Sequence, residues 1–198
     1  MPRSEEQYRQ IREEKRELIL NTALDLFAAQ GFHSTSMEQI AKKAGISKGL
    51  TYNYFTSKKE ILDEILKTGF DAIYAHFDLD KDGILTYEEF EFFIRNSFRI
   101  MMENRSFWKL YFSLMMQPAV TETYKNDYSE KSVDLMKVII RFLTDLGSTD
   151  PQKDLTIISS LLKGAYLIMV TSPEFTDEEK YVDAIFEGFQ RIINHKNN

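Results

Sequence analysis

Apolar residues recur at helical spacing along nearly the whole chain, and no stretch alternates between apolar and polar residues as a strand would. Only 8 of the 198 residues are glycine and 4 are proline, so few positions interrupt a long helix. The pattern therefore predicts an all-α protein of about nine helices. We expect these helices at about 11–30, 36–43, 47–54, from 57 onward, 87–103, 105–117, 121–146, 151–171 and 177–194.

The composition limits where in the cell we expect the protein and which kinds of site it can contain. The chain has no cysteine, which excludes disulfides, zinc–thiolate sites and a cysteine nucleophile and favours a reducing cytoplasm. The N-terminal stretch is charged and lacks the apolar core of a secretory signal. No apolar stretch approaches the roughly 20 residues that cross a bilayer, so we expect no membrane partner.

The residues that usually carry catalysis do not form a recognisable pattern in this chain. His33, His76 and His195 lie in separate segments. The sequence has neither a serine in a nucleophile elbow nor a glycine-rich phosphate loop. We therefore expect a protein that is not an enzyme.

Charge is distributed unevenly along the chain, whose net charge is −6. Residues 1–60 carry 10 basic and 8 acidic side chains, whereas the remainder carries 15 basic and 23 acidic ones. We therefore expect any contact with a polyanion to lie on residues 1–60. The remainder of the chain, which is acidic, should lie away from that contact.

Two short helices are predicted on either side of a glycine turn near residue 45. Ser36 and Gln39 have the spacing of a capping box, which opens the first of these helices. Gly45 permits the positive φ of a sharp turn, and Ser47 caps the second helix. This arrangement is typical of a helix-turn-helix, which places its second helix in the major groove of DNA.

The run from Thr35 to Leu62, TSMEQIAKKAGISKGLTYNYFTSKKEIL, resembles the N-terminal signature of the TetR/AcrR regulators. The preceding ALDLFAAQGF, residues 23–32, fits the first helix of that family. The resemblance is specific over about residues 12–66 and architectural beyond them. It implies a three-helix DNA-binding domain at 1–58, followed by a helical ligand-binding and dimerisation domain at 59–198.

The resemblance also implies which residues touch DNA. Tyr52, Tyr54 and Lys58 fall where the family contacts phosphates, although two tyrosines at helical spacing could simply pack and Lys58 could be solvated. At Leu50 and Thr51 the chain departs from the family, which often has a small residue followed by Leu or Ile, and Leu50 could contact a thymine methyl. The full candidate set is Ser36, Ser47, Lys48, Gly49, Leu50, Thr51, Tyr52, Asn53, Tyr54 and Lys58.

Residues 78–89, DLDKDGILTYEE, match the calcium loop D-x-D-x-D-G-x₅-E. Carboxylates, one carbonyl and a water on a hydroxyl would surround Ca²⁺, with Gly83 at the turn. The candidate ligands are Asp78, Asp80, Asp82, Ile84, Thr86 and Glu89. Alternatively, Thr86 and Glu89 form a capping box and Glu89 turns to the backbone. A calcium-binding helical protein is therefore the second interpretation of the chain, and no other cofactor is expected.

Bulky, soft side chains are concentrated in the middle of the chain. They could fill a core or line an adaptable apolar cavity, and the resemblance favours a pocket for a small apolar or aromatic effector. The candidate pocket residues are Phe98, Met101, Met102, Trp108, Tyr111, Phe112 and Met115.

The last two helices are rich in apolar residues, such as Ile157 and Ile168 in one and Phe186 and Phe189 in the other. This pattern fits either a single broad buried face or a two-fold interface, and the resemblance favours a homodimer through these helices. The resulting prediction is a sequence-specific repressor that binds a palindromic operator as a dimer and is released by a ligand.

Overall fold

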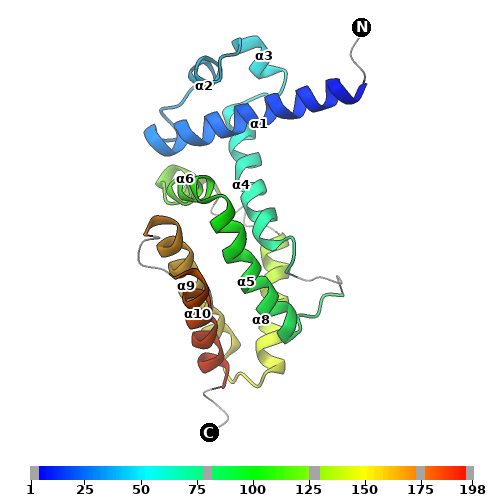
Figure 1. The fold of residues 1–198 in the computed structure, drawn as a ribbon, viewed down its shortest axis with the longest axis vertical. Coiled ribbons are helices and arrows are strands. Elements are labelled where there is room, and N and C mark those ends of the chain that lie inside the picture. Colours follow the sequence, from blue (N-terminus) through cyan, green and yellow to red (C-terminus); the bar gives the residue numbers. More distant parts are fainter. Residues whose placement is uncertain (1–4, 78–81, 125–129, 173–176, 195–198) are drawn as a thin grey trace. The chain divides into compact units, whose positions relative to one another are not determined.

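The computed structural model describes residues 5–77, 82–124, 130–172 and 177–194. These residues form helices joined by turns and contain no strand, so the predicted all-α class is confirmed (Figure 1). The described residues contain ten helices: α1 (Glu5–Gln30), α2 (Met37–Lys43), α3 (Lys48–Tyr52), α4 (Lys58–Tyr74), α5 (Tyr87–Glu103), α6 (Arg105–Met115), α7 (Pro118–Tyr124), α8 (Glu130–Asp145), α9 (Pro151–Thr171) and α10 (Glu178–Asn194).

The helix count differs from the predicted nine because the helix expected at 121–146 is two helices, α7 and α8. Pro118 opens α7 three residues earlier than predicted, since its fixed φ and missing N–H suit the first turn of a helix. The first helix is also longer than predicted, because α1 begins at Glu5.

The chain divides into two compact units. Unit 1 comprises Met1–Phe70 together with Leu110–Thr123, and unit 2 comprises Asp71–Lys109 together with Tyr124–Asn198. The sequence analysis predicted a domain boundary after residue 58. The two units differ from the predicted domains because residues 110–123 group with the N-terminal helices, from which they are distant in the chain.

Unit 1 has a core built where α1 meets the short helices. Figure 1 shows α2 and α3 along one side of α1. The buried side chains of α1 lie in its C-terminal half, between Ile19 and Phe27. Gly69 in α4 lies directly under the ring of Tyr111, where a Cβ would come within 2.2 Å of a ring carbon. The other core residues of this unit include Ile19, Ala23, Phe27, Ile40, Phe55, Ile61 and Leu62.

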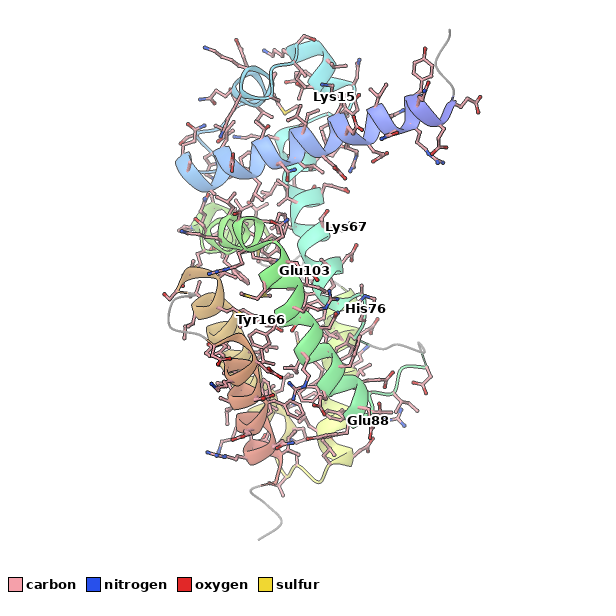
Figure 2. All side chains as sticks on the ribbon, viewed as in Figure 1. Lys15, Lys67, His76, Glu88, Glu103 and Tyr166 are labelled. Atoms are coloured by element: carbon pink, nitrogen blue, oxygen red, sulfur yellow. The ribbon has the colours of Figure 1, made fainter. Side chains whose placement is uncertain are left out.

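Unit 2 has an aromatic core between α5, α8, α9 and α10. Tyr166 of α9, labelled in Figure 2, is 5 % exposed and lies between α9 and α5. Its hydroxyl is 2.5 Å from Ser97 Oγ, and Ser97 Oγ donates to the carbonyl of Ile94. Burial raises the pKa of the Tyr166 phenol, which keeps this hydrogen-bonded pair neutral. Other rings of this core are Phe90, Phe98, Phe142 and Phe189.

Helix α9 is long and apolar enough to cross a membrane by length and composition alone, and 33 % of its most apolar stretch is buried. The sequence expectation that no stretch approaches this length is therefore wrong for α9. Ile157, Leu167 and Ile168 are exposed on it, and Lys163 lies among them. Helix α9 thus buries one face in unit 2 and leaves apolar side chains on another.

Candidate nucleic-acid interface

The capping box at the start of α2 is formed as predicted. Ser36 Oγ accepts from the N–H of Gln39 at 3.2 Å, and Gln39 Oε1 accepts from the N–H of Ser36 at 2.7 Å. Both side chains thereby satisfy donors that the helix start leaves unpaired. The box fixes where α2 begins and so sets the position of the turn that follows.

The turn between α2 and α3 depends on Gly45, whose φ is +68°. A side chain is strained in this left-handed region, whereas glycine is not. The N–H of Ile46 donates to the carbonyl of Ala41 at 3.1 Å, which closes the end of α2. Ser47 then caps α3 by accepting from the N–H of Leu50 at 3.1 Å. The predicted helix-turn-helix is present.

Helix α3 presents most of its predicted DNA-contacting side chains to solvent. Lys48, Gly49, Tyr52 and Asn53 are exposed, as are the two capping serines. Leu50, Tyr54 and Lys58 are half-buried. Helix α3 ends at Tyr52, two residues before the predicted end, and Asn53 is its C-cap in a right-handed helical conformation. Asn53 therefore lies at the end of the helix, and Tyr54 lies in the turn that follows.

The position of Thr51 in the structure does not fit the prediction that this residue contacts DNA. Its side chain is fully buried, with a relative exposure of 0 %. The hydroxyl donates to the carbonyl of Ser47 one turn earlier at 3.3 Å, which satisfies it inside the core. On this five-residue helix Thr51 points inward, so its neighbours make the outward face.

A surface hollow of about 390 Å³ brings together residues from both sides of the turn. Four members of the predicted DNA-contacting set line it, namely Ser36, Lys48, Tyr52 and Lys58. His33 and Glu38 also line the hollow and were not predicted. Their closeness to Ser36 in the sequence could have indicated that they lie here. Lys48 Nζ is 3.4 Å from Glu38 Oε2, and both side chains are more than half exposed, so this pair is weak.

Lys58 occupies a more interior place than the sequence predicted. Its ammonium donates at 2.9 Å to each of three carbonyls, those of Phe32, His33 and Thr35. It also lies 4.8 Å from the centre of the Phe32 ring. Burial lowers the pKa of the Lys58 ammonium. Because all three protons have main-chain partners, a phosphate would have to displace one of them.

The start of α4 is held by a network next to Lys58. Ser57 Oγ accepts from the N–H of Glu60 at 3.1 Å. Glu60 Oε2 accepts from both the hydroxyl and the N–H of Thr56, each at 2.6 Å. These hydrogen bonds, the hydroxyl first, lower the pKa of the Glu60 carboxyl. The ionised carboxylate therefore joins the end of the helix-turn-helix to α4.

The predicted ligand pocket is divided between the two units. Its residues up to Trp108 belong to unit 2, and those from Tyr111 onward belong to unit 1. Trp108 is 1 % exposed and its indole N–H donates to the carbonyl of Ile100, whereas the Tyr111 hydroxyl donates to the carbonyl of Leu66. A hollow of about 300 Å³ in unit 2 includes Phe98 but otherwise lies beside Arg95 and Arg99. The pocket stays a prediction.

The calcium loop falls partly outside the described residues, which do not include Asp78 and Asp80. Within the described part, Asp82 Oδ1 accepts from the N–H of Ile84 at 2.7 Å. Glu89 Oε2 accepts from the N–H and hydroxyl of Thr86 at 2.9 and 2.8 Å, so the capping box is complete. Among the residues that the structure describes, no group of three histidines or carboxylates is placed to hold a metal ion. Calcium binding stays a prediction.

Comparisons with known proteins give different results for the N-terminal segment and for the chain as a whole. Residues 19–65 match the family described as bacterial regulatory proteins, tetR family. The uncharacterized HTH-type transcriptional regulator YuxN of Bacillus subtilis is 47 % identical over 62 residues, which are 31 % of this chain and 21 % of YuxN. The first curated relatives are matched over 21 % to 40 % of their own lengths, so the matched part is less than half of each of them.

Solved structures extend the likeness to the whole fold. A tetR family transcription regulator from Shewanella sp. PV-4 is 25 % identical with a TM-score of 0.63, covering 88 % of this chain and 95 % of that one. SmeT, solved as a complex with triclosan, is 20 % identical with a TM-score of 0.62, covering 88 % and 91 %. Residues 19–65 therefore match the helix-turn-helix segment of the tetR family, and the fold of the chain is similar to that of a solved tetR family transcription regulator.

Proposed function

We propose that the protein is a repressor that binds a palindromic DNA operator as a homodimer and is released by a small apolar or aromatic ligand. The observation that carries the proposal is the outward face of α3, which is exposed and polar on a helix whose opposite face is buried. Such a helix can enter the major groove while the preceding helix crosses the backbone.

The exposed and half-buried residues of this face have two kinds of chemistry, which suit two roles. Lys48 and Asn53 can donate to base edges, and Leu50 can contact a thymine methyl. The phenols of Tyr52 and Tyr54 can donate to phosphate oxygens, which fix the position of the protein without reading sequence. For Lys58 we propose a structural role in place of a phosphate contact, because its three protons reach carbonyls of the chain.

Dimerisation through α9 and α10 is supported by the apolar face that α9 leaves uncovered. Ile157, Gly164 and Ile168 recur at spacings of seven and four residues, which places them on one side of the helix. Ile157 is 42 % and Ile168 is 48 % exposed, and a Cβ on Gly164 would meet nothing within 4 Å. A second copy of α9 could approach closely at this glycine and cover both isoleucines.

Ligand release requires an effector that binds the two conformations of the protein with different affinities. SmeT holds triclosan, a small molecule, within a related fold. We propose that an effector of apolar or aromatic character binds this protein near Phe98 and Trp108, where the body is rich in aromatic and methionine side chains. Its binding would change the separation of the two helix-turn-helix segments of a dimer.

A gel shift followed by footprinting on the DNA upstream of the protein's own gene tests the proposal. We expect protection of a two-fold symmetric site and an affinity that falls steeply between low and moderate salt, because phosphate contacts release counterions. A scrambled duplex of the same length and composition serves as the control. Equal affinity for the two duplexes, or no binding to either, would overturn the proposal.

A further inference from the structure

The connection between α1 and α2, residues 31–36, carries the helix-turn-helix from the end of α1. Gly31 ends α1 with a φ of +92°, and its N–H donates to the carbonyl of Phe27 at 3.0 Å. Phe32 is 7 % exposed and packs edge-on against the Phe27 ring, with 5.2 Å between ring centres. The geometry of this short connection therefore decides how α2 and α3 are directed from α1.

Gln117, between α6 and α7, binds this connection with both ends of its amide. Its Nε2 donates to the carbonyl of Phe27 at 2.7 Å, and its Oε1 accepts from the N–H of Phe32 at 3.1 Å. The partners are 90 and 85 residues away in the chain. Both contacts lie within unit 1, which contains residues 1–70 and 110–123.

The main chain holds Gln117 firmly enough for its side chain to position other groups. Its N–H donates to the carbonyl of Leu114 at the end of α6, and its carbonyl accepts from the N–H of Val120 in α7. Lys58 holds the same connection from α4 through the carbonyls of Phe32, His33 and Thr35. The connection is thus held by a cation from one helix and an amide from another segment.

We propose that Gln117 is a positioning residue for DNA recognition, which acts by holding residues 27–32 and thereby the direction of α2 and α3. It lies outside the stretch that matches the family, so nothing in the helix-turn-helix signature assigns it a role. The inference rests on the proposed DNA-binding function. Losing the amide removes the partner of the Phe32 N–H and leaves the Phe27 carbonyl with only the Gly31 N–H, so the helix-turn-helix can sample other directions, most of which do not fit the major groove.

Two variants and one control separate positioning from general folding. Gln117→Ala removes both hydrogen bonds. In Gln117→Glu the carboxylate still accepts from Phe32 but faces the Phe27 carbonyl without a proton to donate, whereas the protonated acid again has one donor and one acceptor. Gln152→Ala is the matched control, because Gln152 is exposed in α9. Circular dichroism checks that all three variants keep their helices.

The first readout is amide hydrogen exchange over residues 31–37, compared with the wild type at each pH. We expect exchange to rise about tenfold in Gln117→Ala, and in Gln117→Glu at pH 8, because two hydrogen bonds are lost or opposed. At a pH below about 4.3, the ordinary pKa of a glutamate, exchange in Gln117→Glu should return to the wild-type rate. Wild-type exchange in Gln117→Ala would overturn the proposal.

The second readout is the affinity for operator DNA and for a scrambled duplex. We expect Gln117→Ala to lower operator affinity about tenfold and to change affinity for the scrambled duplex less than twofold, because only base contacts need a fixed direction of α3. Equal losses on both duplexes would refute positioning. If the wild type itself does not prefer the operator, the proposed function fails, while the exchange experiment still decides whether Gln117 holds the connection.

Discussion

At the residue scale, Lys58 has main-chain partners that its position in the motif does not predict. Its place four residues after Tyr54 fits a phosphate contact, as the family resemblance implies. In the structure the ammonium instead joins three carbonyls of the α1–α2 connection. An ammonium has three donors and no acceptor, so three carbonyls satisfy it completely.

Lys58→Met should therefore act mainly on folding. It keeps the aliphatic stem against Phe32 but leaves three carbonyls without their donor, and we expect the free energy of unfolding to fall by about 2 kcal/mol in urea denaturation. The dependence of DNA affinity on salt should keep its wild-type slope. A slope reduced by about 0.9 would instead show that Lys58 contacts a phosphate.

Lys59→Met is the matched control for this experiment. The neighbouring lysine changes the net charge equally, is exposed, and pairs with Asp63 one turn along α4. Exposed pairs of this kind contribute roughly 0.3–0.5 kcal/mol, so this variant should unfold nearly as the wild type does. Similar losses in both variants would mean that charge, and not the three carbonyls, explains the effect of Lys58.

At the scale of single helices, side chains that cap helix starts were the most readable signals in this sequence. The boxes at Ser36–Gln39 and Thr86–Glu89 both form, because each needs only residues that are three apart. At Thr86 the box also bears on the calcium loop. One oxygen of Glu89 is engaged by the N–H and hydroxyl of Thr86, although a bidentate calcium ligand needs both oxygens.

Two substitutions distinguish a helix cap from a calcium ligand at the start of α5. Thr86→Ala should lower the free energy of unfolding by about 1 kcal/mol, because the N-cap acceptor is lost. Glu89→Gln should change it by less than about 0.5 kcal/mol, since glutamine also closes a capping box. Thermal unfolding monitored by circular dichroism measures both, and a larger loss in Glu89→Gln would contradict the capping role.

The same glutamine variant tests the calcium prediction without breaking the helix start. Calcium is titrated into the wild type and into Glu89→Gln by calorimetry. Heat in the wild type that is lost in the variant would establish Glu89 as a ligand, because an amide cannot replace a bidentate carboxylate. Indistinguishable titrations would leave Glu89 as a cap alone and reject the calcium loop.

At the scale of the whole molecule, the proposed homodimer can be tested on the exposed apolar face of α9. A buried, unpaired charge is costly, and two-fold symmetry would introduce it twice. We therefore expect Ile168→Glu to raise the dimer dissociation constant about a hundredfold or more in analytical ultracentrifugation. Met136→Glu is the control, because Met136 is 50 % exposed on α8, outside the proposed interface. A dimer that survives Ile168→Glu would place the interface elsewhere.

The amino-acid order alone was sufficient for features that depend on neighbours a few residues apart. The all-α class, the capped starts of α2 and α5, the glycine turn at Gly45 and the family signature are all of this kind. Each is local, so residue spacing decides it without knowledge of what packs against it.

Contacts between distant segments were settled by tertiary structure. Thr51 is buried because a five-residue helix turns it inward, and Lys58 reaches carbonyls that lie 23 to 26 residues earlier. Gln117 and Tyr111 join the N-terminal helices from more than 40 residues beyond them, and Tyr111 does so over a glycine that leaves room for its ring. Which side chains meet at such distances depends on how the helices pack, and helical periodicity specifies only which face of each helix is apolar.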